Sequence, residues 1–179
     1  MANSRFLMII GALSLGVFFT SVVLAQSTQP KCGPDHAILY KKAVKLVDSA
    51  EKKLAAKYTA EAKVQVKEAN ALFSILVKEC GPLQKERALT EREMEQEIAN
   101  NKKKDEYYKK GVALEKSAEE NLKKGQEAEA KNQDTLATQY FRQAKTENEQ
   151  AHASFIQAEI YALKNQEMIF RFLANQPTP

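Results

Sequence analysis

The residues of this 179-residue chain best able to do chemistry are its two cysteines. Each begins the same tripeptide, Cys32-Gly33-Pro34 and Cys80-Gly81-Pro82. Exactly one pair of cysteines in an exported chain predicts a single disulfide, and the export signal is described below. The bond would close a loop of 49 residues. In the chain-entropy model, a loop of that length stabilises the fold by about 4 kcal/mol.

The same residues permit a second kind of site. If the disulfide did not form, Cys32, His36 and Cys80 could meet as metal ligands or serve redox chemistry. Three ligands are one fewer than a closed tetrahedral zinc site requires, and the chain has no Cys-x-x-Cys pair. His36 is otherwise an exposed residue in the first turn of a helix. We therefore expect the disulfide and no cofactor, with a metal or redox protein as the second alternative.

Catalytic patterns are absent from the sequence. The carboxylates have the spacing of solvated helix faces, and no serine has a histidine at a spacing that would suggest a catalytic pair. No glycine-rich phosphate loop occurs. We expect that the protein is not an enzyme.

Residues 1–25 read as a signal peptide. Arg5 provides a basic start, an apolar stretch covers residues 6–23, and Val23-Leu24-Ala25 places small residues at a cleavage site. The alternative is an uncleaved anchor helix. Cleavage would leave a mature chain of residues 26–179 in the periplasm or outside the cell, without a membrane segment.

A net charge of +4 is too small to indicate nucleic acid as a partner.

Composition predicts an all-α fold with one domain over residues 26–179. Alanine, glutamate, lysine and leucine dominate, and glycine and proline are scarce. Apolar residues recur at helical spacing on both sides of residues 56–59, and Gly81-Pro82 predicts a helix end. In one straight helix Cys32 and Cys80 would lie about 70 Å apart. The disulfide therefore requires a short hairpin over about 32–81 that reverses near 56–59.

A long, coiled-coil-like hairpin is predicted over about 82–175, with one helix running from Pro82 to about Lys131. Reversal at Asn132-Gln133 makes the numbers of facing residues sum to about 266. Glycine then faces a ring twice, and asparagine faces asparagine. The facing pairs are Gly111 with Phe155, Gly125 with Phe141, and Asn101 with Asn165. The last helix also carries a heptad in which alanines fill most a positions.

Residues 118–151 resemble a tetratricopeptide repeat. Small and aromatic residues match its core positions, namely Gly125, Ala137, Phe141 and Ala144. The stretch departs from the repeat at Asn121, where an aromatic residue is common, and at Glu149, where proline closes the repeat. The resemblance implies helical-hairpin packing and protein binding.

The C-terminal end is denser in large apolar residues than one helical seam requires. These residues are Ile169, Phe170, Phe172 and Leu173. We expect them to form a contact surface for a protein partner or for self-association. The sequence as a whole favours an exported, non-enzymatic helical adaptor, scaffold or assembly factor. The first alternative is a periplasmic holdase-like chaperone.

Overall fold

The computed structural model describes residues 32–84 and 89–175, and the predicted signal peptide lies outside these ranges. Within them the chain forms four α-helices and a short 3-10 helix, with no strand. The helices are α1 (Pro34–Ala55), α2 (Thr59–Gln84), α3 (Glu91–Ala130) and α4 (Asp134–Phe170), followed by η1 (Arg171–Asn175). The all-α prediction is confirmed.

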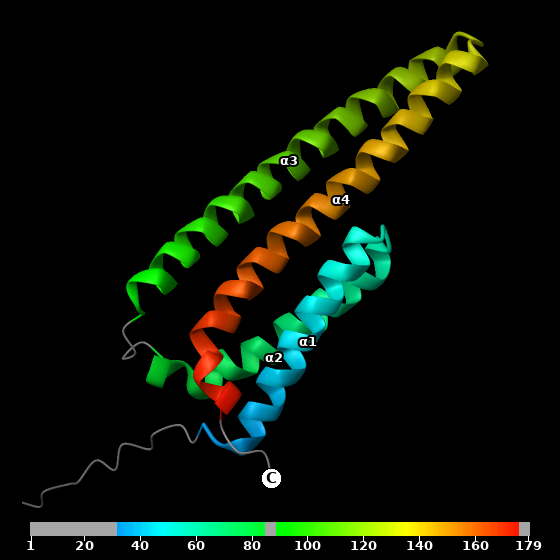
Figure 1. Ribbon diagram of the computed structural model, residues 1–179. Helices are drawn as coiled ribbons and strands as arrows, with labels where there is room; N and C mark the ends of the chain where they lie inside the picture. Colours follow the sequence, from blue (N-terminus) through cyan, green and yellow to red (C-terminus); the bar gives the residue numbers. More distant parts are fainter. Residues whose placement is uncertain (1–31, 85–88, 176–179) are drawn as a thin grey trace, which may run out of the picture.

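The chain forms two antiparallel hairpins, which pack against each other through α4. Helices α1 and α2 form the short hairpin, whereas α3 and α4 form the long one, which extends well beyond it (Figure 1). Helix α4 packs against α3 on one side and against α1 and α2 on the other. Among the described elements, only α4 brings its backbone close to that of α3. We call the paired helices α3 and α4 the arm, whose projecting end is supported by the α3–α4 contact alone (Figure 1).

Both hairpins reverse through the same local structure. Lys57 and Asn132 have left-handed backbone conformations, with φ of 64° and 57°. The residue after each donates its N–H back across the helix end, from Tyr58 to the Lys53 carbonyl and from Gln133 to the Ala128 carbonyl. This pattern is a Schellman motif, which ends a helix by satisfying its last carbonyl groups. The reversals lie where the sequence places them, near 56–59 and at 132–133.

The predicted boundary between the hairpins is wrong by several residues. Helix α2 continues through Gly81-Pro82 to Gln84, and α3 begins at Glu91 instead of Pro82. Gly81 does not adopt the left-handed conformation that would end the helix there. Proline removes only one hydrogen bond, so a helix can continue for a few residues beyond it. The start of α3 is set by Thr90, whose side chain accepts from the Glu93 N–H while the Glu93 carboxylate accepts from the Thr90 N–H.

The main core lies where the short hairpin meets the C-terminal part of α4. Its largest fully buried side chains are Phe73, Leu76, Ile160, Phe170 and Leu173. Phe73 contacts Tyr40 edge to face and stacks with Phe170. The apolar residues predicted from helical spacing in the short hairpin account for most of the rest of this core.

Along the arm, the seam between α3 and α4 consists of small residues. The a-position residues Ala137, Ala144, Ala151 and Ala158 are all buried. Alanine at these positions allows the two helix axes to approach closely. Asn148, at a d position, is exposed instead, so the seam follows the a positions more strictly than the d positions.

Candidate functional site

The cysteine pair forms the predicted disulfide. Cys32 precedes α1 and Cys80 lies in the last turns of α2, and their Cα atoms are 5.3 Å apart. Cys80 is buried and Cys32 is partly buried. The bond joins the open end of the short hairpin and leaves no free cysteine in the described residues.

His36 lies beside this disulfide and is not the exposed residue expected from the sequence. Its side chain is 14% exposed. The Gly33 N–H donates to Nδ1 at 3.0 Å, and Nε2 lies 2.7 Å from the Glu79 carboxylate. Because an N–H can only donate, Nδ1 must be the unprotonated nitrogen, so Nε2 carries the hydrogen that Glu79 accepts. We call Cys32, His36, Glu79 and Cys80 the cysteine clasp.

The arm has the glycine–phenylalanine register predicted from the sequence. A Cβ atom at Gly111 would lie 2.6 Å from the Phe155 ring, and one at Gly125 would lie 2.5 Å from the Phe141 ring. Each ring therefore occupies space that any larger residue would need. These four residues lie at the seam and position the two helices.

An asparagine cluster fixes the register at the base of the arm. The Asn100 amide donates to Asn165 at 2.8 Å, and the Asn165 amide donates to Asn101 at 3.1 Å. Asn100 and Asn165 are buried, and Gln96 donates to the Asn100 oxygen at 3.0 Å, so both side-chain amides have a donor and an acceptor as partners. A shift of α3 along α4 would leave those groups without partners, which is costly in a dry interior.

The prediction that Ile169, Phe170, Phe172 and Leu173 form a contact surface for a partner is wrong, because they belong to or pack against the main core. Phe170 is 1% exposed and Leu173 is fully buried. Ile169 and Phe172 are partly buried against the same core. The surplus of apolar residues is explained because the short hairpin covers the side of α4 that α3 leaves open. Phe170 and Leu173 are therefore core residues and are not available to a partner in this fold.

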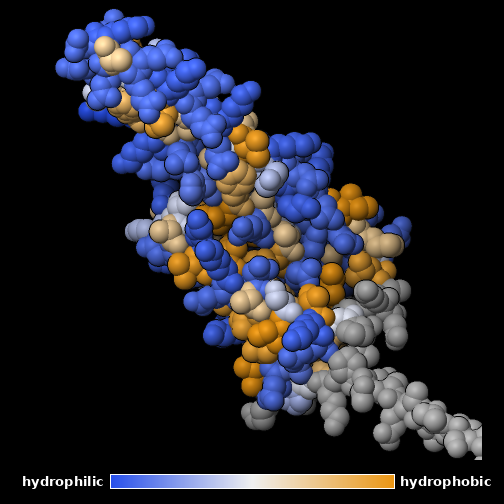
Figure 2. Space-filling model, turned by 180° about the vertical axis from the view of Figure 1, so that it is seen from behind, coloured by the Kyte–Doolittle hydropathy of each residue, from blue (hydrophilic) through white to orange (hydrophobic). Residues whose placement is uncertain are grey.

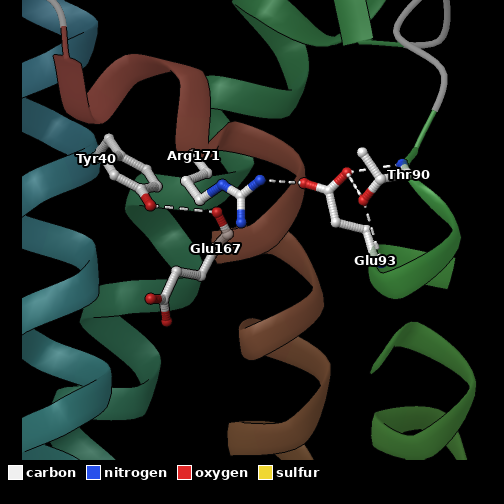
Figure 3. Close-up of polar contacts among 5 residues, drawn as sticks. All are labelled: Tyr40, Thr90, Glu93, Glu167 and Arg171. Atoms are coloured by element: carbon white, nitrogen blue, oxygen red, sulfur yellow. Dashed lines mark hydrogen bonds and ion pairs between the residues drawn. The ribbon is translucent and has the colours of Figure 1, made fainter. Parts of the chain in front are cut away.

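Polar contacts tie α3 and the short hairpin to the end of α4 (Figure 3). The Arg171 guanidinium donates to the Glu93 carboxylate at 2.5 Å, and Glu93 also accepts from the Thr90 N–H and hydroxyl. On the other side, the Tyr40 hydroxyl donates to the Glu167 backbone carbonyl at 3.3 Å. The Glu93–Arg171 contact therefore adds to the α3–α4 seam near the start of α3, and the Tyr40 contact joins α1 to α4.

Burial shifts two acidic groups in this region. The pKa of Tyr40 is raised to about 12, first by burial and then by the negative charge of Glu167, while Arg171 opposes the shift. The pKa of Glu167 is itself raised, first by burial and then by the negative charge of Asp48. Lys164 opposes this shift, and Glu51 adds to it. Both residues line a polar concave surface of about 710 Å³ among α1, α3 and α4.

Two neighbouring concave surfaces lie along α4. One part, of about 730 Å³, lies among α2, α3 and α4, and a second, of about 940 Å³, lies between α4 and the turn joining α1 to α2. Both parts are lined by Lys63, His152 and Ile156, so they are neighbours along α4 and together cover Thr146 to Ala162. Seventeen helical residues span about 25 Å. We call the two parts together the α4 groove.

The α4 groove combines an apolar floor with charged walls. Phe155, Ile156, Ala158 and Ala162 line it from α4, and Tyr108, 59% exposed, stands beside Phe155 on α3. Figure 2 shows hydrophobic side chains gathered between the two hairpins, whereas the projecting end of the arm is mostly hydrophilic. A surface of this kind fits the apolar stripe of another helix. The arrangement has no convergent acid, base and nucleophile.

Sequence reasoning missed the α4 groove. Phe155 was recognised as a seam residue, and nothing in the spacing indicated that its other side faces a channel. To predict the groove one would need the angle at which the short hairpin packs against α4. No short sequence pattern determines that angle. The Thr90-x-x-Glu93 pattern is a recognisable helix start and could have moved the boundary of α3.

Fold and site together define an all-α protein of two hairpins with a disulfide and an apolar groove. No helix in the described ranges has the length and apolar content needed to cross a membrane. No family model, no curated protein and no solved structure matches the chain.

Proposed function

We propose that this protein is an exported, non-enzymatic helical scaffold that binds a protein partner in the α4 groove. The observation that supports the proposal is the groove itself, about 25 Å long, apolar at its floor and walled by helices. An exposed groove of that size is typical of binding surfaces, because isolated apolar side chains on a surface do not line up in this way.

An amphipathic helix is the occupant that fits best. A length of about 25 Å matches nearly five turns of helix. The small side chains Ala158 and Ala162 let a helix approach closely, and Phe155 and Tyr108 give it aromatic surface to contact. A helix bound in such a groove contacts it through apolar side chains spaced three and four residues apart.

The rim gives the expected charge pattern of the partner. Lys63 and Lys67 stand on α2, whereas α3 contributes Glu115 and the ion pair of Lys104 with Asp105, at 3.4 Å. A partner helix would place acidic residues toward α2 and basic residues toward α3. A uniformly anionic ligand such as nucleic acid would meet carboxylates on the α3 wall, so the groove favours a protein.

Export is proposed from two features. The disulfide is a bond that persists in oxidising compartments and is rare in the cytosol. The N-terminal 25 residues have the composition of a cleaved signal. Tracking the processed chain by N-terminal sequencing of the periplasmic or secreted fraction tests this part.

Site-specific photo-crosslinking tests the groove. A photoreactive phenylalanine analogue at Tyr108 should give an adduct with one protein in native cells, and the crosslinked peptide should be an amphipathic helix. The matched control is the same analogue at Leu122, which is also exposed on α3 but lies outside the groove. Equal adducts at both positions, or none at Tyr108, contradict the proposal.

Charge reversal then tests the rim with the crosslinked peptide itself. Lys63→Glu with Lys67→Glu should weaken binding at least about tenfold, since two attractive contacts become repulsive. Lys42→Glu with Lys45→Glu makes the same charge change on exposed residues of α1, outside the groove, and should leave affinity unchanged. Binding that depends only on net charge would respond equally to both pairs.

A holdase-like chaperone is the second candidate, and a separate observation favours it. Helix α3 exposes several large apolar side chains along its length. They are Met94, Ile98, Tyr108, Val112 and Leu122. A chaperone would suppress aggregation of unrelated unfolded proteins, and replacing Ile98 and Val112 by serine should then reduce that activity. A scaffold specific for one helix would show no such suppression.

A further inference from the structure

We infer that the cysteine clasp is a redox-gated zinc site, which binds Zn²⁺ through Cys32, His36 and Cys80 once the disulfide is reduced. The ligand atoms of these three residues all lie within 4.8 Å of one another. This site is separate from the α4 groove, and it stands or falls independently of the scaffold proposal.

The geometry suits a tetrahedral ion. Two sulfur ligands of zinc lie about 3.8 Å apart, given Zn–S bonds of about 2.3 Å at tetrahedral angles. The Cα atoms of Cys32 and Cys80 are 5.3 Å apart, so side-chain rotation alone can open the sulfurs to that separation. Cys32 lies just before α1 and Cys80 within α2, and the short hairpin keeps both backbones in place.

His36 is already oriented as a metal ligand. Nδ1 carries the lone pair, because it accepts the Gly33 N–H at 3.0 Å. Nε2 lies 2.7 Å from the Glu79 carboxylate, to which it donates its hydrogen. Histidine ligands of zinc usually donate their second nitrogen to a carboxylate, which fixes the tautomer and strengthens the metal bond. Zinc would replace the Gly33 N–H at Nδ1, and Glu79 would keep its place.

The cysteine clasp is open to solvent on one side, where a fourth zinc ligand could bind. Cys80 is buried, whereas Cys32 and His36 are partly exposed and Glu79 is 51% exposed. Water can therefore fill the remaining position and the ion can enter from solvent. Three protein ligands with one water is a coordination that zinc accepts. Two sulfurs and an imidazole favour zinc over the harder ions magnesium and calcium.

The change of state balances in two steps. A dithiol reductant passes two electrons and two protons to the Cys32–Cys80 disulfide, yielding two thiols while the reductant becomes a disulfide. Zinc then binds both sulfurs as thiolates, and the two thiol protons leave to solvent. A disulfide oxidant that takes two electrons from the two thiolates, and two protons from solvent, becomes a dithiol and restores the Cys32–Cys80 bond, which expels the ion because no thiolate remains. Oxidised and zinc-bound forms are mutually exclusive.

Cobalt titration of the full chain tests the site, since Co²⁺ replaces zinc and absorbs light. The chain is reduced anaerobically with a phosphine that does not bind metals. One equivalent of Co²⁺ should produce a thiolate-to-cobalt charge-transfer band in the near ultraviolet, and one equivalent of Zn²⁺ should abolish it. The oxidised chain should show no band.

Variants of the imidazole and its carboxylate partner separate a built site from two free thiols. His36→Ala should weaken Zn²⁺ affinity at least about tenfold, and Glu79→Gln about tenfold. Matched controls are His152→Ala and Glu68→Gln, both at exposed positions outside the clasp, which should leave affinity unchanged. Both cysteines remain in every variant, so each can still form the disulfide.

A second readout covers the case in which the reduced chain loses structure. Zn²⁺ in excess should raise the Tm of the reduced chain, because an ion that binds the folded form stabilises it by mass action. The inference is wrong if reduced chain gives no charge-transfer band and no rise in Tm. It is equally wrong if His36→Ala binds Zn²⁺ as tightly as the parent chain.

Discussion

Gly111 lies against the ring of Phe155 so closely that it has no room for a side chain. A Cβ atom there would be 2.6 Å from Cε1 and 2.8 Å from Cδ1 and Cζ of the ring. Real Cβ atoms do not approach other atoms so closely, and the obstacle is a ring on a packed helix, not a flexible chain end. The contact explains why α3 carries glycine in the middle of a helix, where glycine costs about 1 kcal/mol.

Gly111→Ala should therefore lower the free energy of unfolding by about 1–3 kcal/mol, because the overpacked ring must move. Urea unfolding followed by circular dichroism measures the change. Ala113→Gly on the exposed side of the same helix calibrates propensity, and it should cost about 0.5–1 kcal/mol. If steric conflict is the cause, adding Phe155→Leu to Gly111→Ala should recover part of the loss. A stabilising Gly111→Ala would mean that propensity dominates and the contact is unimportant.

Much of the fold could be predicted from the sequence because the determining signals are local or regularly spaced. The disulfide constrains the short hairpin, and the spacing of Gly111 and Gly125 against Phe155 and Phe141 sets the register of the long one. The boundary near Gly81 was misplaced, because glycine and proline break a helix only when the backbone adopts the matching conformation. The alternative start at Thr90 depends on a side-chain bond to Glu93.

The partner surface could not be predicted in the same way. The seam between α3 and α4 does not need Phe170, so the sequence suggests that its side chain is exposed. In the structure it is 1% exposed, because a second set of helices covers it. Its true contact, Phe73, is almost a hundred positions away in the sequence, in the other hairpin. How two hairpins dock decides which apolar residues stay exposed, and that docking depends on shape across α1, α2 and α4 together.

Loss of the disulfide should destabilise the protein more than any surface change. Cys32→Ala with Cys80→Ala is expected to lower the free energy of unfolding by about 4 kcal/mol, since the unfolded chain regains the freedom of the loop. Reduction of the parent chain in the presence of a chelator should give a similar loss, measured by the urea midpoint. A parent chain whose midpoint ignores reductant, or that yields two free thiols on mass mapping, would contradict the bond.

Lys57 offers a stabilising change. Its φ of 64° is unfavourable for a residue with a side chain, at about 1–2 kcal/mol, whereas glycine adopts it freely. After the entropy that glycine costs, about 0.5–1 kcal/mol, Lys57→Gly should raise the free energy of unfolding by about 0.5–1 kcal/mol. Asn132→Gly, at φ of 57°, serves as the comparison and should gain less, because asparagine tolerates this conformation. Thermal unfolding measures both, and a lower Tm for Lys57→Gly would refute the account.

Glu167 should make stability fall as pH rises. Its folded pKa is raised above the ordinary 4.5, first by burial and then by Asp48, with Glu51 adding and Lys164 opposing. The folded state therefore binds the proton more tightly than the unfolded state, so stability is lost as pH rises from 4.5 through the folded pKa. Glu167→Gln should be more stable than the parent at pH 7, and the difference should vanish near pH 4. Urea midpoints across this range measure it, with exposed Glu149→Gln as the control. A difference that does not vary with pH would exclude titration of Glu167 as its cause.

The contact between Glu93 and Arg171 should act as the tie between α3 and the end of α4. The Glu93 side chain is 5% exposed and that of Arg171 is 58% exposed, so only the carboxylate depends on its partners for solvation. Arg171→Ala should lower the free energy of unfolding by about 1 kcal/mol, a modest value because the guanidinium is largely in water. Glu93→Gln should lower it also, by loss of the ion pair. The double variant should cost less than the sum of the two, by about 1 kcal/mol, because each single change already removes the contact between Glu93 and Arg171. A double-mutant cycle by urea unfolding measures this coupling.

Arg142→Ala, an exposed arginine on α4, controls for loss of charge. Additive effects of Glu93→Gln and Arg171→Ala would show that α3 is attached by its seam with α4 alone.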